Sequence, residues 1–404
     1  MTILLIAALS LDAIYPRLDA LYIDLHKAPE LSGREERTGA RMAAELGRLG
    51  FEVTSGVGGH GVVGVLKNGA GPTVLLRAEL DGLPVEEKTG LPYASRNGAM
   101  HACGHDAHMA AWVGAAAVLV ERRTSWSGTL VMVAQPAEET VRGARAMLAD
   151  GLVTRFPKPD FCVAVHDRGD APAGKVLPVP GYGLAASDSV DVTFFGRGGH
   201  GARPETTVDP IVIAARFVVA VQTLVSRERD PLDPGVVTVG SFHGGTKHNI
   251  ISDEVRLQLT VRSFTPAVRD LLISGIERIA RAEAAAANAP RAPAVAVIES
   301  IGATYNDPAL TKRLAAALAR ELDVEEGRPE MGAEDFGEIC RAASAPSTML
   351  RIGAVEPAKF AAAKASGAPL PSLHSPLFAP DRERTIRTGA AALALSALEL
   401  FARR

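Results

Sequence analysis

The chain has 404 residues, 47% of them hydrophobic, with a formal net charge of −3. This length exceeds the size at which a single hydrophobic core usually stops growing, so we expect two domains. The near balance of 43 basic and 46 acidic residues gives no general attraction to nucleic acid or to an anionic membrane. The composition therefore argues against both as partners and favours a small neutral molecule.

Cysteine content and the N-terminus both favour a cytoplasmic protein. Cys103, Cys162 and Cys340 are odd in number and widely spaced, which excludes a disulfide framework and is typical of a reducing compartment. The N-terminal run MTILLIAALSLDA is apolar, but no Lys or Arg precedes it and it is too short to cross a bilayer. We expect this run to be part of the first helix rather than an export signal.

The first part of the chain reads as alternating helices and strands. Helical spacing of apolar residues predicts two helices within residues 14–49, with Gly50 ending the second. The Ala-rich stretch 109–123 predicts a further helix. Near-continuous apolar strands separated by helices indicate an α/β fold with a largely parallel sheet flanked by helices. The predicted strands are residues 61–67, 72–78, 128–135 and 161–166.

The pattern changes near Ser187. From there the order is strand, helix, strand, strand, helix, strand, which is the order of a ferredoxin-like α+β unit. A helical pattern resumes at residues 307–323. We therefore predict an inserted domain over residues 187–301 and a main domain formed by residues 1–186 and 302–404.

Ligand-type side chains follow three of the predicted strands. Asp81 follows one strand, the pair Glu138 and Glu139 follows the next, and His166 ends the third. Because the carboxyl ends of parallel strands meet at one edge of a sheet, we expect these side chains to lie close together.

We expect the next helix to begin near Met109. The stretch MHACGHDAH, residues 100–108, would then be a loop at the same edge of the sheet. Imidazole, thiolate and carboxylate groups together suit Zn, Co, Ni or Mn. Each histidine alone is more often a structural loop residue, but their convergence predicts a metal site. A nucleophilic Cys103 beside His105 is the weaker alternative.

Other motifs are absent or lack their structural context. Residues 56–61 match GxGxxG, but a predicted strand follows where a dinucleotide site needs a helix, so we expect a loop between strands. The sequence contains no GxxxxGK[ST] motif and no GxSxG motif.

Seven motifs in order resemble those of the M20 metallopeptidase clan. The most similar branch is the amidohydrolases that include hippurate hydrolases, N-acyl amino acid deacylases and indoleacetyl-amino acid hydrolases. The chain departs from the usual pattern at two places. Asp is more common than Glu at position 79, and the Asp-Arg-Gly-Asp sequence at residues 167–170 predicts a more polar rim of the substrate pocket. The motifs are RAELDGLPVEE (77–87), MHACGHDAH (100–108), AQPAEE (134–139), GRGGHGARP (196–204), KHNIIS (247–252), MGAEDF (331–336) and LHSPLF (373–378).

The resemblance implies a catalytic main domain that holds two divalent metal ions, foremost Zn or Mn, with Co or Ni as further candidates. Glu138 would be the general acid/base, and Asp81 would hold a metal ligand in place. Amide hydrolysis at neutral pH needs hydroxide, here bridging the two ions, and metal-bound water supplies it. The implied ligands are Cys103, which would bridge the ions, His105, Glu139, His166 and His374.

The resemblance also implies that the inserted domain is a lid that mediates homodimerisation. His200 would reach the active site of the partner subunit and stabilise the oxyanion of the reaction. Asn249 would hold the polar end of the substrate, and Arg262 would pair with a free carboxylate unless it forms a surface salt bridge. The predicted substrate is a small amide, such as an N-acyl amino acid. A dipeptidase or carboxypeptidase of the same clan, and a non-catalytic metal-binding scaffold, are the alternatives.

Overall fold

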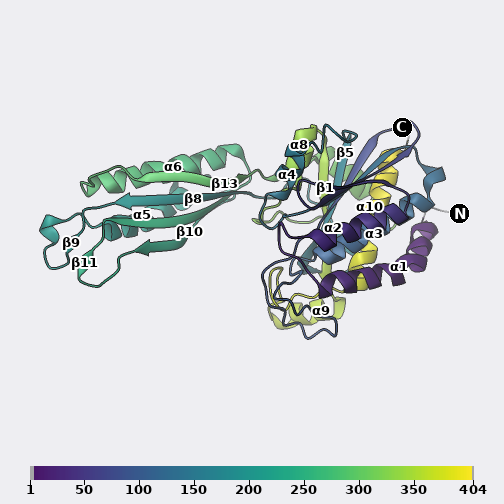
Figure 1. Cartoon of the computed structure of the whole chain (residues 1–404), viewed down its shortest axis with the longest axis horizontal. Coiled ribbons are helices and arrows are strands. Elements are labelled where there is room, and N and C mark those ends of the chain that lie inside the picture. The colour runs from purple at the N-terminus through teal and green to yellow at the C-terminus, as the bar shows by residue number, and fades with distance from the viewer. Residues whose placement is uncertain (1–3, 403–404) are drawn as a thin grey trace. The chain divides into compact units, whose positions relative to one another are not determined.

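The computed structural model describes residues 4–402. The chain divides into two compact units, of which the first comprises residues 1–183, 305–329 and 334–404. The second unit comprises residues 184–304 and 330–333. Figure 1 shows the helices and strands of each unit.

The first unit contains an eight-stranded sheet with the order β1-β2-β4-β3-β5-β16-β6-β15. The central strands β4, β3, β5 and β16 run parallel, whereas β2 pairs antiparallel with both β1 and β4. This confirms the predicted largely parallel sheet. The strands are β1 Glu52–Val57, β2 Gly61–Asn68, β3 Thr73–Glu79, β4 Gly128–Gln135, β5 Phe161–Pro172, β6 Lys175–Leu177, β15 Asp323–Val324 and β16 Ser347–Val355.

Helices pack against this sheet. Helix α3 contacts β3, and α10 contacts β3, β5 and β16, while α1 packs on both helices. Helices α4 and α8 contact each other and reach β4 and β5. Consecutive positions of β3 are buried, as expected for a strand covered on both faces. The helices are α1 Leu4–Lys27, α2 Glu36–Arg48, α3 His105–Glu121, α4 Gly143–Ala149, α7 Pro308–Leu318, α8 Phe336–Ala343, α9 Pro357–Ser366 and α10 Arg382–Phe401.

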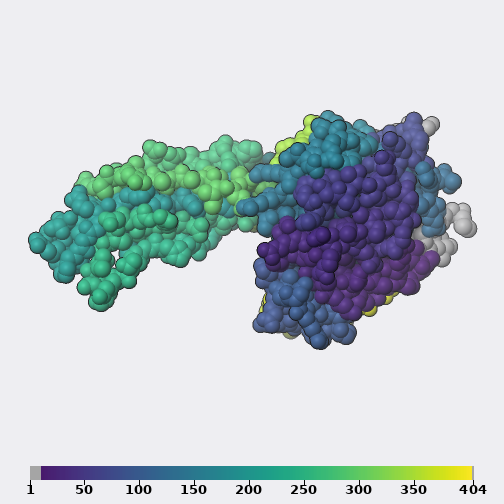
Figure 2. Space-filling model, in the orientation of Figure 1, coloured from purple at the N-terminus to yellow at the C-terminus, as the bar shows by residue number. Residues whose placement is uncertain are grey.

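The N-terminal part of the chain forms much of the first unit's visible surface, coloured purple to blue in Figure 2. Its apolar run enters helix α1 from Leu4 onward, and residues 1–3 lie outside the described part. Residues 56–61 span the end of β1, a turn and the start of β2. The expected loop between strands is confirmed, so the helix that a dinucleotide-binding motif requires does not follow these residues.

The second unit has the predicted ferredoxin-like order of elements. Its four-stranded sheet, β10-β12-β8-β13, is antiparallel throughout, and helices α5 and α6 pack on it (Figure 1). Strands β9 and β11 form a short separate ribbon, as do β7 Gly181–Leu184 and β14 Thr304–Asn306. The second unit's elements are β8 Ala186–Phe195, β9 Gly199–His200, α5 Pro210–Thr223, β10 Gly235–Gly244, β11 Ile250–Ile251, β12 Glu254–Ser263, α6 Pro266–Ala286 and β13 Ala294–Ile301.

One helical stretch in the described part of the chain, Pro210–Glu228, is long and apolar enough to cross a membrane. Length and composition alone are weak evidence, and 33% of this stretch is buried within the protein. Its buried residues Ile213, Phe217 and Val221 belong to the core of the second unit. The apolar character of α5 is therefore explained in part by its packing.

Helix α3, which carries part of the candidate site, packs very closely against its neighbours at Gly114. A Cβ atom there would lie 2.8 Å from Leu18 Cδ1 and 2.9 Å from Ala390 Cβ. Gly47 in helix α2 has no atom within 4 Å of the corresponding position. The two glycines therefore offer the same substitution in a crowded and in an open environment.

We expect Gly114→Ala to lower the free energy of unfolding by about 1–3 kcal/mol through overpacking. Gly47→Ala should raise it by up to about 1 kcal/mol, because Ala is the better helix former. Both tryptophans, Trp112 and Trp126, lie in the first unit, so tryptophan fluorescence during urea denaturation measures its unfolding. Equal stability of the two variants would contradict the close packing at Gly114.

Candidate metal centre

The stretch 100–108 begins helix α3 earlier than the sequence predicts. The helix starts at His105 rather than near Met109, so His105 and His108 lie in its first turns and not in a loop. Gly104 precedes it with φ 85°, and a Cβ atom there would lie 2.4 Å from Asp167 Oδ2. Glycine is therefore the residue that fits this start of the helix.

The five predicted metal ligands come together in the first unit, with Cys103 in the middle. Its Sγ lies 3.6 Å from His166 Nε2 and 3.3 Å from His374 Nε2. Glu139 places one carboxylate oxygen 3.5 Å from His374 Nε2 and the other 3.9 Å from His105 Nε2. The side chains form two groups that share Cys103, namely Cys103–His105–His166 and Cys103–Glu139–His374. A thiolate shared by two groups could bind two neighbouring ions.

Two buried atoms of this cluster have no hydrogen-bond partner within the described chain. They are His105 Nε2 and Glu139 Oε1. The Nδ1 atom of His105 lies 2.8 Å from the main-chain carbonyl oxygen of Asp81, which can only accept, so Nδ1 carries a proton and Nε2 is the ring nitrogen left to bind a cation. A buried polar atom without a partner costs about 1–3 kcal/mol. A divalent cation between these atoms would remove that cost, so the donor set fits a metal.

Asp81 contacts two of the predicted ligands. Its carbonyl oxygen accepts from His105, and its carboxylate accepts from the Glu139 N–H at 3.0 Å. The hydroxyl of Ser32 donates to the same carboxylate oxygen at 2.6 Å. Asp81 therefore lies where it can hold both ligands, as the sequence predicts for it.

Glu138 is buried beside the ligands, with Oε2 3.8 Å from His105 Nε2. Burial raises the pKa of its carboxyl well above the ordinary value, and the charge of Glu334 adds to this effect. Burial likewise raises the pKa of the Cys103 thiol. A bound cation would act in the opposite direction, because it favours the thiolate and the carboxylate.

Sequence reasoning missed the acidic network behind Glu138. The buried guanidinium of Arg77 donates to Glu334 at 2.6 and 3.2 Å, to Asp335 at 3.1 Å and to Glu79. The available signal was an arginine inside an otherwise apolar strand, which needs buried partners. The motifs around residues 77 and 334 were recognised from the sequence, but no role was assigned to these side chains.

His166 lies within strand β5, which runs on to Pro172, and not at a strand end as predicted. The following residue, Asp167, is buried with 1% of its surface exposed. Arg168 instead pairs with Asp170, at 2.7 Å. The prediction that residues 167–170 make the rim polar is therefore wrong for Asp167, because its side chain faces the interior.

The other three predicted site residues belong to the second unit. His200 is exposed on strand β9, opposite Ile250 of β11, and its Nδ1 accepts from the Ala202 N–H at 3.1 Å. The carbonyl oxygen of Asn249 accepts from the Gly201 N–H at 2.8 Å, so Asn249 is near His200. Arg262 lies on a different strand, β12, where its Nε donates to Thr260 Oγ1 at 3.2 Å. Burial lowers the pKa of Arg262.

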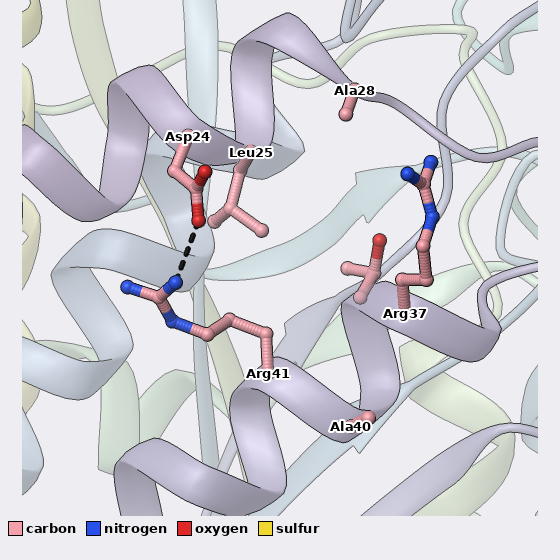
Figure 3. Close-up of a pocket in the computed structure, with 7 residues that line it drawn as sticks. Asp24, Leu25, Ala28, Arg37, Ala40 and Arg41 are labelled. Carbon is pink, nitrogen blue, oxygen red and sulfur yellow. Dashed lines mark hydrogen bonds and ion pairs between the residues drawn. The ribbon is translucent and has the colours of Figure 1, made fainter.

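A surface pocket of about 440 Å³ lies between helices α1 and α2 (Figure 3). The charged groups at its edge already have partners, since Arg41 binds Asp24 at 2.6 Å and Arg37 binds Glu30 at 3.2 Å. None of the predicted site residues lines this pocket.

Comparison with known proteins agrees with the geometry. The model of the family described as "Peptidase family M20/M25/M40" matches residues 75–369 of the chain. The chain belongs to this family. The resemblance seen in the sequence motifs is thereby confirmed.

Two relatives and one solved structure span most of the chain. Hippurate hydrolase of Campylobacter jejuni is 37% identical over 323 residues, which cover 78% of this chain and 83% of that protein. Thermostable carboxypeptidase 1 of Saccharolobus solfataricus is 35% identical over 381 residues, or 93% of each chain. A Bacillus subtilis protein described as a dinuclear metal binding peptidase of the M20 family superposes with a TM-score of 0.80 at 27% identity, and covers 96% of this chain and 99% of that one.

We expect added Zn²⁺ or Mn²⁺ to raise the melting temperature of the metal-free protein, because the ion binds the folded ligand cluster. At a hundredfold excess of metal over Kd the gain is about 2.7 kcal/mol. Cys103→Ser should reduce this gain strongly, as measured by calorimetry with and without a chelator.

Cys340→Ser is the matched control. Cys340 is also buried and free, but its Sγ contacts the carbonyl oxygen of Phe336 in helix α8. This variant should keep the full metal-dependent rise in melting temperature. The same rise in Cys103→Ser as in the wild type would contradict the assignment of Cys103 to the centre.

Proposed function

We propose that this protein is a dinuclear metal-dependent amidohydrolase that cleaves the amide bond of N-acyl amino acids or related small conjugates. One observation carries the proposal: two candidate ligand groups share Cys103, and the buried carboxyl of Glu138 lies beside them. Family membership supports the reaction class. The hippurate hydrolase of Campylobacter jejuni supports the type of substrate.

The proposed ligands are the side chains that converge around Cys103, which both groups share and which would therefore contact both ions. The donor set of thiolate, imidazole and carboxylate suits Zn or Mn, and it accepts Co or Ni. When bound, such ions would lower the pKa of water and polarise the carbonyl group of the amide. The other ligands in this proposal are His105, Glu139, His166 and His374.

Glu138 is the proposed proton shuttle. Amide hydrolysis removes a proton from water and delivers one to the leaving nitrogen, and a single carboxylate can perform both transfers. Glu138 suits this role because it is buried, close to His105 and in neither group that contains Cys103, although it also forms a candidate group with His105 and Glu139. Its neighbour Glu139 then serves the metal, so the two adjacent glutamates have different tasks.

The second unit is proposed to complete the site in a homodimer. His200 of one subunit would stabilise the oxyanion formed in the partner's active site. Asn249, close to His200, would hold the polar end of the substrate, and Arg262 would bind its carboxylate. The exposed position of His200 supports this proposal, because an exposed side chain is free to meet another subunit.

The proposals for the cellular location and for the binding partners rest on the sequence alone. We propose a cytoplasmic enzyme with a small-molecule amide as its substrate. The net charge of −3 offers no general basis for binding nucleic acid or an anionic membrane.

A peptidase activity is the second candidate. The carboxypeptidase of Saccharolobus solfataricus, similar over 93% of this chain, favours it. Assays of N-acetyl and N-benzoyl amino acids beside dipeptides would separate the two activities. A non-catalytic metal-binding scaffold is the least supported alternative, because it would have no use for a buried carboxyl such as that of Glu138.

We expect Glu138→Gln to keep its metal and its fold but to lose turnover by a factor of roughly 10²–10⁴, the usual contribution of a general acid or base. Release of free amino acid from N-acyl substrates measures turnover, and elemental analysis measures the metal. Glu139→Gln is the matched comparison and should lose both metal and turnover. Normal turnover in Glu138→Gln would refute the proton shuttle.

We expect two inactive variants to complement each other if His200 acts across the dimer. Glu138→Gln and His200→Ala subunits, coexpressed in equal amounts, should recover about a quarter of the wild-type activity, because half of the dimers are mixed and each mixed dimer has one intact site. The activity of the purified mixture provides the measurement. No recovery in verified mixed dimers would show that His200 does not act in trans.

A further inference from the structure

His166, one of the proposed ligands, is oriented by the main chain of the residue that follows it. Its Nδ1 lies 3.0 Å from the carbonyl oxygen of Asp167. Because a carbonyl oxygen can only accept, Nδ1 carries the proton and Nε2 presents its lone pair. This Nε2 is the atom that lies 3.6 Å from Cys103 Sγ. The direction of the lone pair therefore depends on the main chain at Asp167.

Asp167 lies three residues beyond Ala164, the last residue of strand β5 that pairs with β3. On one side, β16 continues beside β5, with Ile352 opposite Asp167. On the other side, the pairing with β3 ends earlier, with Arg77 opposite Ala164. A side chain takes the place of that strand, since the N–H of Asp167 donates to His108 Nε2 at 2.9 Å. Helix α3 thus provides the acceptor that β3 does not.

The ring of His108 is fixed at both nitrogens. Its Nε2 accepts from the Asp167 N–H at 2.9 Å and also lies 3.4 Å from the Asp167 carboxylate, while its Nδ1 donates to Glu79 Oε2 at 2.9 Å. The other carboxylate oxygen of Glu79 accepts from Arg77. His108 and Glu79 are both buried, with 2% and 0% of their surfaces exposed. Although Glu79, His105 and His108 lie close enough to hold a cation, both nitrogens of His108 are already in use.

We propose that His108, held by Glu79, is a positioning residue for the metal ligand His166. It acts through the N–H of Asp167 and touches neither the substrate nor the metal. This inference rests on the proposed function, because it takes His166 as a ligand. A hydrogen-bond partner that binds a metal ligand directly typically contributes tenfold to a hundredfold in metal affinity, and His108 acts one step behind such a partner. The proposal also gives a role to Glu79, one of the two places at which the sequence departs from the motifs that it resembles.

The first test compares two amides at position 108. In His108→Gln the side-chain carbonyl can reach the place of Nε2 and accept from the Asp167 N–H. In His108→Asn the shorter side chain reaches only the place of Nδ1 and leaves that N–H without an acceptor. We expect the zinc affinity, measured by competition with a chromophoric chelator, to fall by up to roughly tenfold in His108→Asn, the lower end of the effect of a direct partner, and much less in His108→Gln.

The second test uses a matched pair of carboxylates around Arg77. In Glu79→Gln the side chain keeps only one oxygen to accept from the two donors, Arg77 and His108 Nδ1–H. Its NH₂ group must therefore face one of these donors. Glu334→Gln removes the same charge from the same guanidinium but keeps the acceptor of His108. We expect weaker zinc binding in Glu79→Gln alone, although both variants should melt at a lower temperature than the wild type.

Different results would overturn different claims. Wild-type zinc affinity in His108→Asn, or equal losses in the Asn and Gln variants, would overturn the role of His108. If the variants at position 108 do not fold, equal zinc affinities of Glu79→Gln and Glu334→Gln would overturn it instead. A wild-type protein that binds no zinc, and that gives no thiolate absorption with Co²⁺, would overturn the proposed function itself.

Discussion

The buried carboxylates next to the candidate metal centre depend on their ion pairs with the guanidinium of Arg77. It binds Glu79, Glu334 and Asp335, which are all buried. Removing one partner of a buried ion pair typically costs 3–5 kcal/mol, because the other charge is left without compensation. With Arg77 in place, Glu79 can serve as a fixed acceptor for His108. The single positive charge of Arg77 also partly offsets the carboxylates of Glu334 and Asp335 near Glu138.

The sheet determines where this charge and the ligands meet. Strand β3 carries both Arg77 and Glu79, and Asp81 follows it directly. Because β3 stops pairing with β5 at Ala164, His166 lies just beyond the shared ladder, where the start of helix α3 can approach. Gly104 allows this approach, since any side chain there would meet the Asp167 carboxylate. The ligands therefore depend on main-chain positions that the sheet and one glycine define.

Most of the fold could be predicted from simple patterns in the sequence, whereas the full proposed ligand set, including His374, followed from the resemblance to the M20 motifs. Apolar runs identified the strands, the order of elements identified the ferredoxin-like unit, and strand ends indicated Asp81 and Glu139. The start of α3 was misplaced because the polar residues His105 and His108 are buried in its first turns, which an apolar pattern does not reveal. The pairing of Arg77 with Glu334 joins residues 257 positions apart, and no local pattern encodes such a contact.

Cys103 and His374 lie 271 residues apart in the sequence, although their side chains are in contact. An ion held by both side chains would close a loop that contains the whole second unit. The entropy lost on closing a flexible loop grows only with the logarithm of its length, so each doubling costs only about 0.6 kcal/mol more. Within this loop, residues 184–304 of the second unit can therefore change in length at a small entropic cost, whereas strands β4, β5 and β16 cannot, because they place the other ligands.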